Sequence, residues 1–265
     1  MSKSWKINLW GVRGSAPTPL MEYMEYGGNT TCISVERENH MVIFDAGTGL
    51  TVLGGKLNQQ KHMRLDIIIS HLHIDHVTGL FLFQPFFSPN MEICLHGGIG
   101  LKQHLKQLIS SPWWPIGIQD FKAKICFHEI QVGASFNLGN FTVSTMNGNH
   151  PGNSILYRLD SDGKSLIYAL DCEADEEIVA KIENFSYGSD LIVWDAYFTD
   201  EDFVDGWGHS TWKQGIKAGH NAAIKRVLMT HYNHEYTDEF LHSQEEIARK
   251  NAICLFAKEG MEIIL

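Results

Sequence analysis

Four side chains that can bind metal lie within six consecutive positions of this 265-residue chain. They follow the apolar residues 67–69 and Ser70, and they are His71, His73, Asp75 and His76. Imidazole nitrogen and carboxylate oxygen suit zinc, and they also suit manganese and iron. A chance cluster in a His-rich loop is the alternative. The spacing His-x-His-x-Asp-His directly after an apolar run favours a metal site.

The apolar run ahead of these ligands determines where they lie. Three successive isoleucines at 67–69 are typical of a strand that is buried on both faces. The ligands then fall in the loop at the carboxyl end of that strand, where α/β sheets place their sites. In an extended chain His71 and His73 point to the same side. We expect a helix at 77–83, which would turn Asp75 and His76 toward a second ion.

The decamer at 67–76 resembles the signature of the metallo-β-lactamase superfamily, and the resemblance extends from about residue 7 to residue 231. It implies a fold of the α/β (α+β) class, a four-layer αββα sandwich with a dinuclear metal site at one edge. No linker, low-complexity tract or internal repeat divides the chain. We therefore expect residues 1–265 to form a single metallo-β-lactamase-like hydrolase domain.

The same resemblance implies the remaining ligands. It places His71, His73 and His150 at one divalent ion and Asp75, His76 and His231 at the other, with Asp171 as the bridge. The two ions are expected to be zinc, although manganese or iron also fits. Cys172 is adjacent to Asp171, so its side chain should face elsewhere. The sequence around His231 departs from the family pattern, which leaves His234 as an alternative last ligand.

Three residues are predicted to take part in catalysis: His209, Asp75 and Asp45. In the branch that resembles ribonuclease Z and PhnP-type phosphodiesterases, a His-Ser-Thr stretch like His209-Ser210-Thr211 supplies the general acid. Asp45 resembles the family's aspartate that hydrogen-bonds a ligand histidine and fixes its tautomer. Without the resemblance, His209 would be a helix-start residue and Asp45 a turn or cap residue.

The predicted substrate is a small anionic phosphodiester such as a cyclic nucleotide or cyclic phosphate. Ribonuclease Z proteins commonly insert a tRNA-gripping arm between the third ligand and the bridging Asp. Here only 21 positions (171 − 150) separate His150 from Asp171. The net charge of −10 also disfavours nucleic acid as a partner. A ribonuclease Z-like tRNA 3′-processing endonuclease is the alternative, followed by a thioester or lactam hydrolase and by a metal-binding protein without catalysis.

Two further features near the predicted site have more than one interpretation. Arg13 lies in the Gly-rich segment 11–15, which the resemblance places near the active site, and it is expected to be solvated rather than to meet the substrate. Trp113 and Trp114 follow a proline and could stack on a nucleobase. They suit a core contact or a homodimer contact equally well.

The five cysteines are Cys32, Cys94, Cys126, Cys172 and Cys254. They contain no Cys-x-x-Cys pair, so the sequence predicts neither a zinc knuckle nor a disulfide framework. Residues 1–6 lack the apolar core of a signal peptide, and no apolar run is long enough to span a membrane. A reduced, cytoplasmic setting is the resulting expectation.

The other elements are predicted from hydrophobic periodicity and turn residues. A β-hairpin is expected at 30–36 and 41–44, and a second at 154–159 and 164–170. Further strands are expected at 5–10, 92–95, 141–146, 191–194 and 227–229. Helices are expected at 50–57, 101–108, 212–224 and 238–251.

Overall fold

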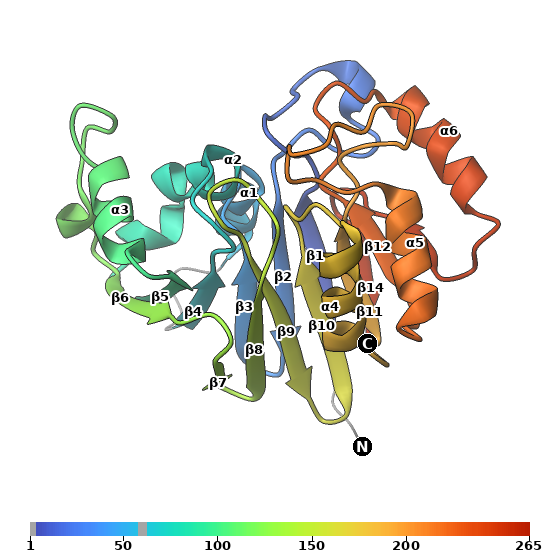
Figure 1. Cartoon of the computed structure of the whole chain (residues 1–265). Coiled ribbons are helices and arrows are strands. Elements are labelled where there is room, and N and C mark those ends of the chain that lie inside the picture. The colour runs from blue at the N-terminus through green and yellow to red at the C-terminus, as the bar shows by residue number, and fades with distance from the viewer. Residues whose placement is uncertain (1–3, 58–62) are drawn as a thin grey trace.

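The computed structural model describes residues 4–57 and 63–265, and within these residues two seven-stranded sheets pack face to face (Figure 1). Part of the amino-terminal segment considered above, residues 1–3, lies outside the described residues. Helices cover the outer face of each sheet, which makes four layers. This is the αββα sandwich that the resemblance to the metallo-β-lactamase superfamily implies.

The first sheet has the strand order β14-β1-β2-β3-β4-β5-β6. Its β2–β3 hairpin confirms the first predicted hairpin, and β3, β4, β5 and β6 run parallel. The parallel strands bring their carboxyl ends to one edge. The bounds are β1 Lys6–Gly11, β2 Cys32–Arg37, β3 His40–Phe44, β4 Met63–Ile68, β5 Met91–Gly98, β6 Lys124–Ile130 and β14 Glu262–Ile264.

The second sheet has the strand order β13-β12-β11-β10-β9-β8-β7. Its β9–β10 hairpin confirms the second predicted hairpin, and β10, β11, β12 and β13 run parallel. The sequence analysis did not predict the short edge strands β7 and β13. The bounds are β7 Ser135–Leu138, β8 Phe141–Asn147, β9 Ile155–Ser161, β10 Lys164–Ala169, β11 Leu191–Asp195, β12 Val227–Thr230 and β13 Cys254–Phe256.

Helices α1 (Gly49–Lys56) and α3 (Leu101–Leu108) pack on the first sheet, and α4 (Glu176–Ser186), α5 (Trp212–Asn221) and α6 (Asp238–Ala248) on the second (Figure 1). The sequence analysis missed α4. The helix predicted at 77–83 is instead the one-turn α2 (Ile74–Val77) followed by 3-10 turns at Thr78–Leu82 and Gln84–Phe87. A further 3-10 turn lies at Met21–Tyr23 and another at Ile118–Asp120.

Strand alternation divides the core into two parts. Phe44 and Ile68 point into the space between the sheets, and Phe44 stacks on Tyr168 of the second sheet with ring centroids 4.8 Å apart. Their neighbours Ile43 and Ile67 point the other way and pack under α1 and α3. Because successive strand residues face opposite sides, a strand that is covered on both faces must be apolar throughout.

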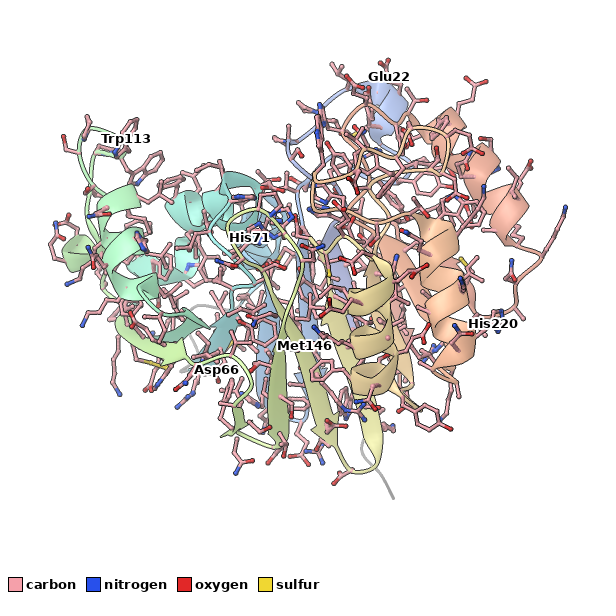
Figure 2. The ribbon with its side chains drawn as sticks, viewed as in Figure 1. Glu22, Asp66, His71, Trp113, Met146 and His220 are labelled. Atoms are coloured by element: carbon pink, nitrogen blue, oxygen red, sulfur yellow. A yellow bond between two sulfur atoms is a disulfide. The ribbon has the colours of Figure 1, made fainter. Side chains whose placement is uncertain are left out.

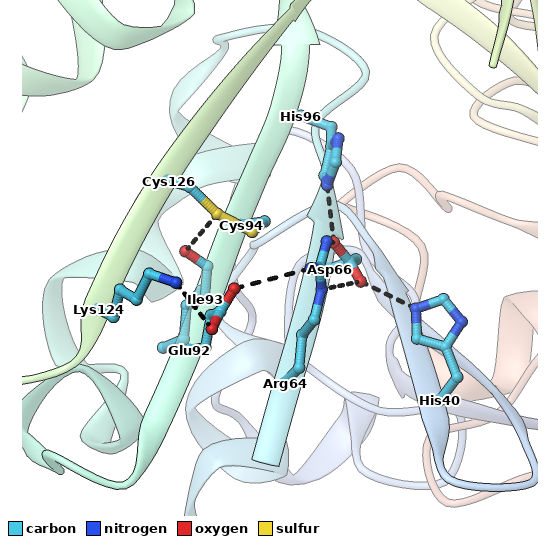
Figure 3. Close-up of a disulfide and its surroundings, with 9 residues drawn as sticks. All are labelled: His40, Arg64, Asp66, Glu92, Ile93, Cys94, His96, Lys124 and Cys126. Carbon is cyan, nitrogen blue, oxygen red and sulfur yellow. Dashed lines mark hydrogen bonds and ion pairs between the residues drawn. A yellow bond between two sulfur atoms is a disulfide. The ribbon is translucent and has the colours of Figure 1, made fainter. Parts of the chain in front are cut away.

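One cysteine prediction is wrong. Cys94 on β5 and Cys126 on β6 form a disulfide (Figure 3). The two residues are partners in the parallel register and their Cα atoms are 4.5 Å apart, although 32 positions separate them in the sequence. Local spacing therefore could not reveal the pair. Because this disulfide forms, the cysteine pattern is no longer a reason to expect a reducing compartment.

Helix length and hydropathy also bear on the membrane prediction. No helix in the described part of the chain has both the length and the apolar character that a bilayer crossing requires.

Candidate metal centre

The potential ligands gather where the parallel strands of both sheets end. Asp45 follows β3, residues 70–76 follow β4, Asp171 follows β10 after one intervening residue, and His231 follows β12. His150 comes from the loop between β8 and β9. In Figure 2 His71 lies at this upper edge, above the strands and close to the β8–β9 loop. The topology thus assembles a single cluster from residues spread over 186 positions (231 − 45).

The side chains form two groups around Asp171. Its Oδ1 lies 3.9 Å from His71 Nε2 and 3.7 Å from His150 Nε2. Its Oδ2 lies 3.0 Å from His76 Nε2 and 3.2 Å from His231 Nε2. The structure therefore brings together the seven predicted ligands and puts the carboxylate of Asp171 between the two sets.

His73 and Asp75 complete the two groups. The ligand atoms of His71, His73 and His150 lie within 4.8 Å of one another, and so do those of Asp75, His76 and His231. His73 is the exposed member of the first group, while His71 and His150 are buried. The cluster consequently opens to solvent on the His73 side.

Electrostatics favour a cation within this cluster. Burial alone would lower the pKa of His231, but the carboxylates of Asp171, Asp195 and Asp75 raise it to about 10. Burial opposes ionisation of Asp171 as well, yet His231, His76 and His71 hold its pKa well below the ordinary value. The carboxylates thus remain charged and attract positive charge, whether it comes from protons or from metal ions.

Asp45 orients two of the imidazoles. Its Oδ2 accepts a hydrogen bond from His76 Nδ1 at 2.7 Å and one from the Ser70 hydroxyl at 2.8 Å. Because the Ser70 proton is used in that bond, Ser70 Oγ accepts from His71 Nδ1 at 3.0 Å. Both rings therefore turn Nε2 toward Asp171. Tyr168 adds a third bond to the Asp45 carboxylate at 2.6 Å.

The His150 ring is oriented by the loop that also carries His209. His150 Nδ1 donates to the carbonyl of Gly208 at 2.8 Å, which leaves Nε2 for the cluster. Gly208 N donates in turn to Glu173 Oε2 at 2.9 Å. A Cβ at Gly208 would overlap the His150 ring, and the residue has φ +82°. Only glycine fits this position without displacing a ligand.

His209 lies beside the cluster and is paired with a buried carboxylate. His209 Nδ1 lies 2.9 Å from Asp195 Oδ2 and 3.9 Å from Asp171 Oδ1. Its ring stacks on Tyr197, with centroids 4.3 Å apart and an angle of 16° between the planes. Burial alone would raise the pKa of Asp195, but His209 and His231 hold it below its usual value. The contact with Asp195 holds the His209 ring through Nδ1 and leaves Nε2 as the nitrogen that can face a substrate.

Three residues of the cluster adopt left-handed backbone conformations. Asp45, Asp171 and His231 have φ of 56°, 51° and 61°. Such conformations are uncommon outside glycine and cluster at functional sites, where the surrounding structure holds them. Here each follows a parallel strand, and the turn out of the strand carries its side chain into the space between the sheets.

The donor set fits metal ions. Asp171 Oδ2 and His71 Nε2 are buried and have no hydrogen-bond partner among the described residues. Unsatisfied buried polar atoms are rare in native structures and point to a missing partner. Five imidazoles and two carboxylates converge on that space, and both ligand types suit divalent metals.

The structure corrects the prediction for Arg13. Its side chain is fully buried rather than solvated, and it donates to the carbonyls of Gly27 at 2.7 Å and Tyr236 at 2.6 Å. The loop nevertheless reaches the site, since Ser15 N donates to Asp75 Oδ2 at 2.8 Å. Arg13 thus anchors the loop and does not face a substrate.

The structure distinguishes the two candidates for the last metal ligand, His231 and His234, by their positions. His231 Nε2 is 3.3 Å from His76 Nε2, inside the cluster. His234 is only partly buried, and its Nδ1 lies 3.4 Å from the Tyr197 hydroxyl. The geometry therefore favours His231 over His234.

The two tryptophans differ in environment. Trp114 is partly buried against Phe81, with ring centroids 4.8 Å apart. Trp113 is 73% exposed and lines a cavity of about 450 Å³ together with Leu72 and His104. Base stacking by Trp113 stays a prediction.

Sequence reasoning missed three residues that complete the site: Asp195, Tyr197 and Glu173. Asp195 carried a usable signal, because it ends the apolar strand β11 in the way that Asp45 follows β3. Tyr197 and Glu173 carried none, since their contacts with His209 and Gly208 arise only from the folded loops.

Comparison with known proteins agrees with this architecture. A family model described as "Beta-lactamase superfamily domain" matches residues 40–232. The chain is 22% identical to a protein named ribonuclease Z from Thermoplasma volcanium, over an alignment of 292 positions that covers 90% of each chain. It is 22% identical to the ribonuclease Z of Nitrosopumilus maritimus, over 88% of this chain and 93% of that one.

Solved structures share the fold at lower identity. A metallo-β-lactamase fold protein, YhfI from Bacillus subtilis, superposes with a TM-score of 0.79 at 17% identity over the whole of both chains. A diphosphatase of the PhnP family gives 0.74 at 16% identity, covering 99% of this chain and 97% of that one. The short form of human tRNase Z gives 0.70 at 18%, covering 97% and 98%. The chain therefore belongs to the metallo-β-lactamase superfamily and is similar to its ribonuclease Z and PhnP-like members.

Proposed function

We propose that this protein is a metal-dependent phosphodiesterase that binds two divalent ions, zinc in the first instance. His71, His73 and His150 would hold one ion, and Asp75, His76 and His231 the other, with Asp171 between them. When bound, the ions would supply Lewis acidity toward phosphoryl oxygens and lower the pKa of water toward about 7. Asp45 acts as a positioning residue through His76 and Ser70.

The observation that carries the proposal is the His209–Asp195 pair beside the ligand cluster, 2.9 Å apart. Cleavage of a phosphodiester expels an alkoxide, which needs a proton from a positioned acid. His209 is within 5.2 Å of His150 between ring centroids, so it faces the same space as the ligands. Asp195 would orient the His209 ring through Nδ1, so that Nε2 could donate a proton to the leaving oxygen. A thioester or lactam hydrolase has less need of such a donor.

The comparisons favour an RNA substrate over the small diester that the sequence analysis ranked first. The relatives named ribonuclease Z align over about nine-tenths of the chain. We therefore propose RNA 3′-end processing as the first candidate reaction. It would use the same ligands, with His209 donating to the leaving 3′ oxygen of the RNA.

Hydrolysis of a small phosphodiester is the second candidate, and two observations support it. The compact β9–β10 hairpin fills the segment between His150 and Asp171 and leaves no inserted arm there. A cavity of about 530 Å³ beside His71 is lined by apolar side chains, amides and histidines, and by no Lys or Arg. Such a cavity suits a neutral group attached to the phosphate.

One substrate panel tests these candidates. Metal-replete protein is assayed on pre-tRNA with a 3′ trailer, 2′,3′-cyclic nucleotides, bis(p-nitrophenyl) phosphate, a thioester and a lactam, and its metal content is measured. We expect about two ions per chain and cleavage of phosphodiesters only. Asp171→Ala is expected to lose both metal and activity. Thioester or lactam turnover without phosphodiester cleavage, or a protein that binds no metal, would overturn the proposal.

The same panel ranks the two substrates. Removal of the pre-tRNA trailer at a kcat/KM above that for every small diester would support the ribonuclease. Cleavage of small diesters with an intact trailer would support the second candidate. The control is Asp171→Ala on each substrate, which separates this active site from a contaminating nuclease.

A further inference from the structure

Two neighbouring strands of the first sheet carry the same short pattern, far from the candidate metal centre. Cys94-Leu95-His96 lies on β5 and Cys126-Phe127-His128 on β6. The register pairs Cys94 with Cys126 and His96 with His128. Residues two apart on a strand share a face. The two cysteines and two histidines therefore form a square of soft ligands on one face of the sheet.

Three of these side chains already have the spacing of a metal site. The sulfur atoms of Cys94 and Cys126 and a ring nitrogen of His128 lie within 4.8 Å of one another. In a tetrahedral zinc site two thiolates at about 2.3 Å from the ion are roughly 3.8 Å apart. A Cα–Cα distance of 4.5 Å between the cysteines allows that separation by side-chain rotation alone.

The cluster of Cys94, Cys126 and His128 is buried at Cys94 and open to solvent at His128. Cys94 is buried, Cys126 is partly buried and His128 is exposed, so a reductant and a metal ion can reach the sulfur atoms from the His128 side. The His128 ring stacks on His96, with centroids 4.8 Å apart and an angle of 16° between the planes. His96 Nε2 lies 2.9 Å from buried Asp66 Oδ1 (Figure 3).

His96 is a buried neighbour of the three grouped side chains. Its side chain is 4% exposed, and its Nδ1 has no hydrogen-bond partner among the described residues.

We propose that Cys94, Cys126 and His128 form a redox-gated site for zinc or a similar soft divalent ion. In the oxidised form the disulfide occupies both sulfur atoms and the site binds no metal. Reduction gives two thiols that bind the ion as thiolates together with His128. His96 supports the His128 ring by stacking, and solvent takes the remaining position of a tetrahedral ion.

The redox step balances with a dithiol as the reductant. One thiolate of the dithiol attacks the sulfur of one cysteine, breaks the Cys94–Cys126 bond and releases the other cysteine as a thiolate. The second thiol of the dithiol then attacks the resulting mixed disulfide and releases the remaining cysteine. Two electrons pass to the protein, the dithiol becomes a disulfide, and both cysteines end as thiols. Metal binding then releases both thiol protons.

This site is separate from the candidate metal centre. In Figure 2 Asp66, the partner of His96, lies well below His71. The candidate metal centre contains only nitrogen and oxygen donors. Cobalt bound through sulfur therefore reports on the redox-gated site alone, apart from Cys172, which adjoins Asp171 and is replaced by serine in every protein used for the test.

The test is a Co²⁺ titration of the full-length Cys172→Ser protein. One sample keeps the disulfide, and a second is reduced with a phosphine and desalted without oxygen. We expect a thiolate-to-cobalt charge-transfer absorption only in the reduced sample. We also expect about one more bound Zn²⁺ per chain in that sample than in the oxidised one. Neither readout depends on phosphodiester hydrolysis, so failure here and failure of the proposed function are distinguishable.

Variants assign the ligands. Cys94→Ser with Cys126→Ser should remove the absorption, and Cys254→Ser should keep it. His128→Ala should weaken cobalt binding by at least about tenfold, whereas exposed His220→Ala should not change it. No absorption in the reduced protein, or equal cobalt affinity in the His128→Ala and His220→Ala proteins, would overturn the proposal. Because His128 is exposed, this comparison stands even if the double cysteine variant fails to fold.

Discussion

At the scale of single residues, the candidate metal centre depends on carboxylates that act on histidines. Asp45 orients His76, and Asp195 pairs with His209. Both carboxylates are fully buried and lie directly at the end of a strand. Each compensates its own burial by accepting several hydrogen bonds, as buried charges must. Contacts within the protein thus set the ring orientations.

The substitution His209→Ala tests whether His209 is the general acid. The variant should keep its metal content, because His150 and Asp171 keep their other contacts. It should slow cleavage of diesters with poor leaving groups by about a hundred- to ten-thousandfold, the usual range for general acid catalysis. Bis(p-nitrophenyl) phosphate, whose leaving group needs little protonation, should be affected much less. Equal losses on both substrate types, or loss of one metal ion, would show that His209 is not the acid. His220→Ala serves as the surface control.

A second prediction concerns Asp66, a buried carboxylate outside the centre. It accepts from His40, His96 and Arg64 at 2.8 to 3.1 Å (Figure 3). Burial alone would raise its pKa, but these partners hold it well below the ordinary 3.8. A lowered pKa in the folded state adds stability above pH 3.8 that is lost as the pH falls further.

Asp66→Asn should therefore reduce the free energy of unfolding at neutral pH, by about 1–3 kcal/mol for a lost charged hydrogen-bond network. The difference from the wild type should shrink as the pH falls from 5 to below 3.8. Urea unfolding of metal-free wild type and variant at matched pH values measures it. A difference that stays constant or grows on acidification would contradict the assigned direction of the pKa shift.

At the scale of elements, loops at the strand ends determine the position of the ligands. The segment from Gly206 to His209 holds the His150 ring through one carbonyl and carries the proposed acid one residue later. Helix α5 begins directly after this segment with Thr211 as its N-cap, which accepts from Gln214 N. The capped helix thus provides a rigid end for a loop that reaches into the site.

Gly208→Ala and Gly206→Ala form a matched pair for this loop. Both glycines have positive φ, +82° and +79°, so both substitutions carry similar backbone strain. Only at Gly208 would the new Cβ meet the His150 ring, whereas nothing lies within 4 Å of the position at Gly206. Gly208→Ala should lower metal content and activity well beyond the loss in Gly206→Ala. Elemental analysis after dialysis measures the metal content of each variant. Equal losses in the two variants would identify backbone strain as the only cause.

At the scale of the whole molecule, the acidic charge limits how nucleic acid can bind. The chain has 21 Lys and Arg against 31 Asp and Glu. Affinity for RNA depends strongly on neutralised phosphates, and each such contact steepens the salt dependence. Even if the protein processes RNA, most of the attraction must come from the candidate metal centre itself.

The salt dependence of tRNA binding measures how many phosphate contacts the protein surface makes. We expect a loss of less than about tenfold in affinity between about 50 and 200 mM salt, which corresponds to about two phosphate contacts. Filter binding of pre-tRNA to the Asp171→Ala variant, with metal absent, gives the contribution of the surface alone. A loss of about a thousandfold or more would reveal an extended basic surface that the net charge conceals.

Much of the architecture was available from the sequence, because periodicity reports burial directly. The apolar run before Ser70 specified a doubly covered strand, and the spacing after it specified ligands at the strand end. Both predicted hairpins and helix α3 follow from local turn and helix signals. Strand β13 has only three residues, too few for a clear period. Helix α4 did carry local signals, an N-cap at Asp175 and an acidic first turn at Glu176 and Glu177, and the sequence analysis missed them.

Contacts between segments far apart in sequence were decided by the tertiary structure alone. The pairing of Cys94 with Cys126 depends on the register of β5 and β6, which no local spacing encodes. Arg13 is buried because Gly27 and Tyr236, 14 and 223 positions away, supply carbonyls for its guanidinium. The sequence by itself determined which side chains could bind metal, since that depends on residue type. Which of them meet, and which carboxylate orients each ring, depends on how the two sheets bring their strand ends together.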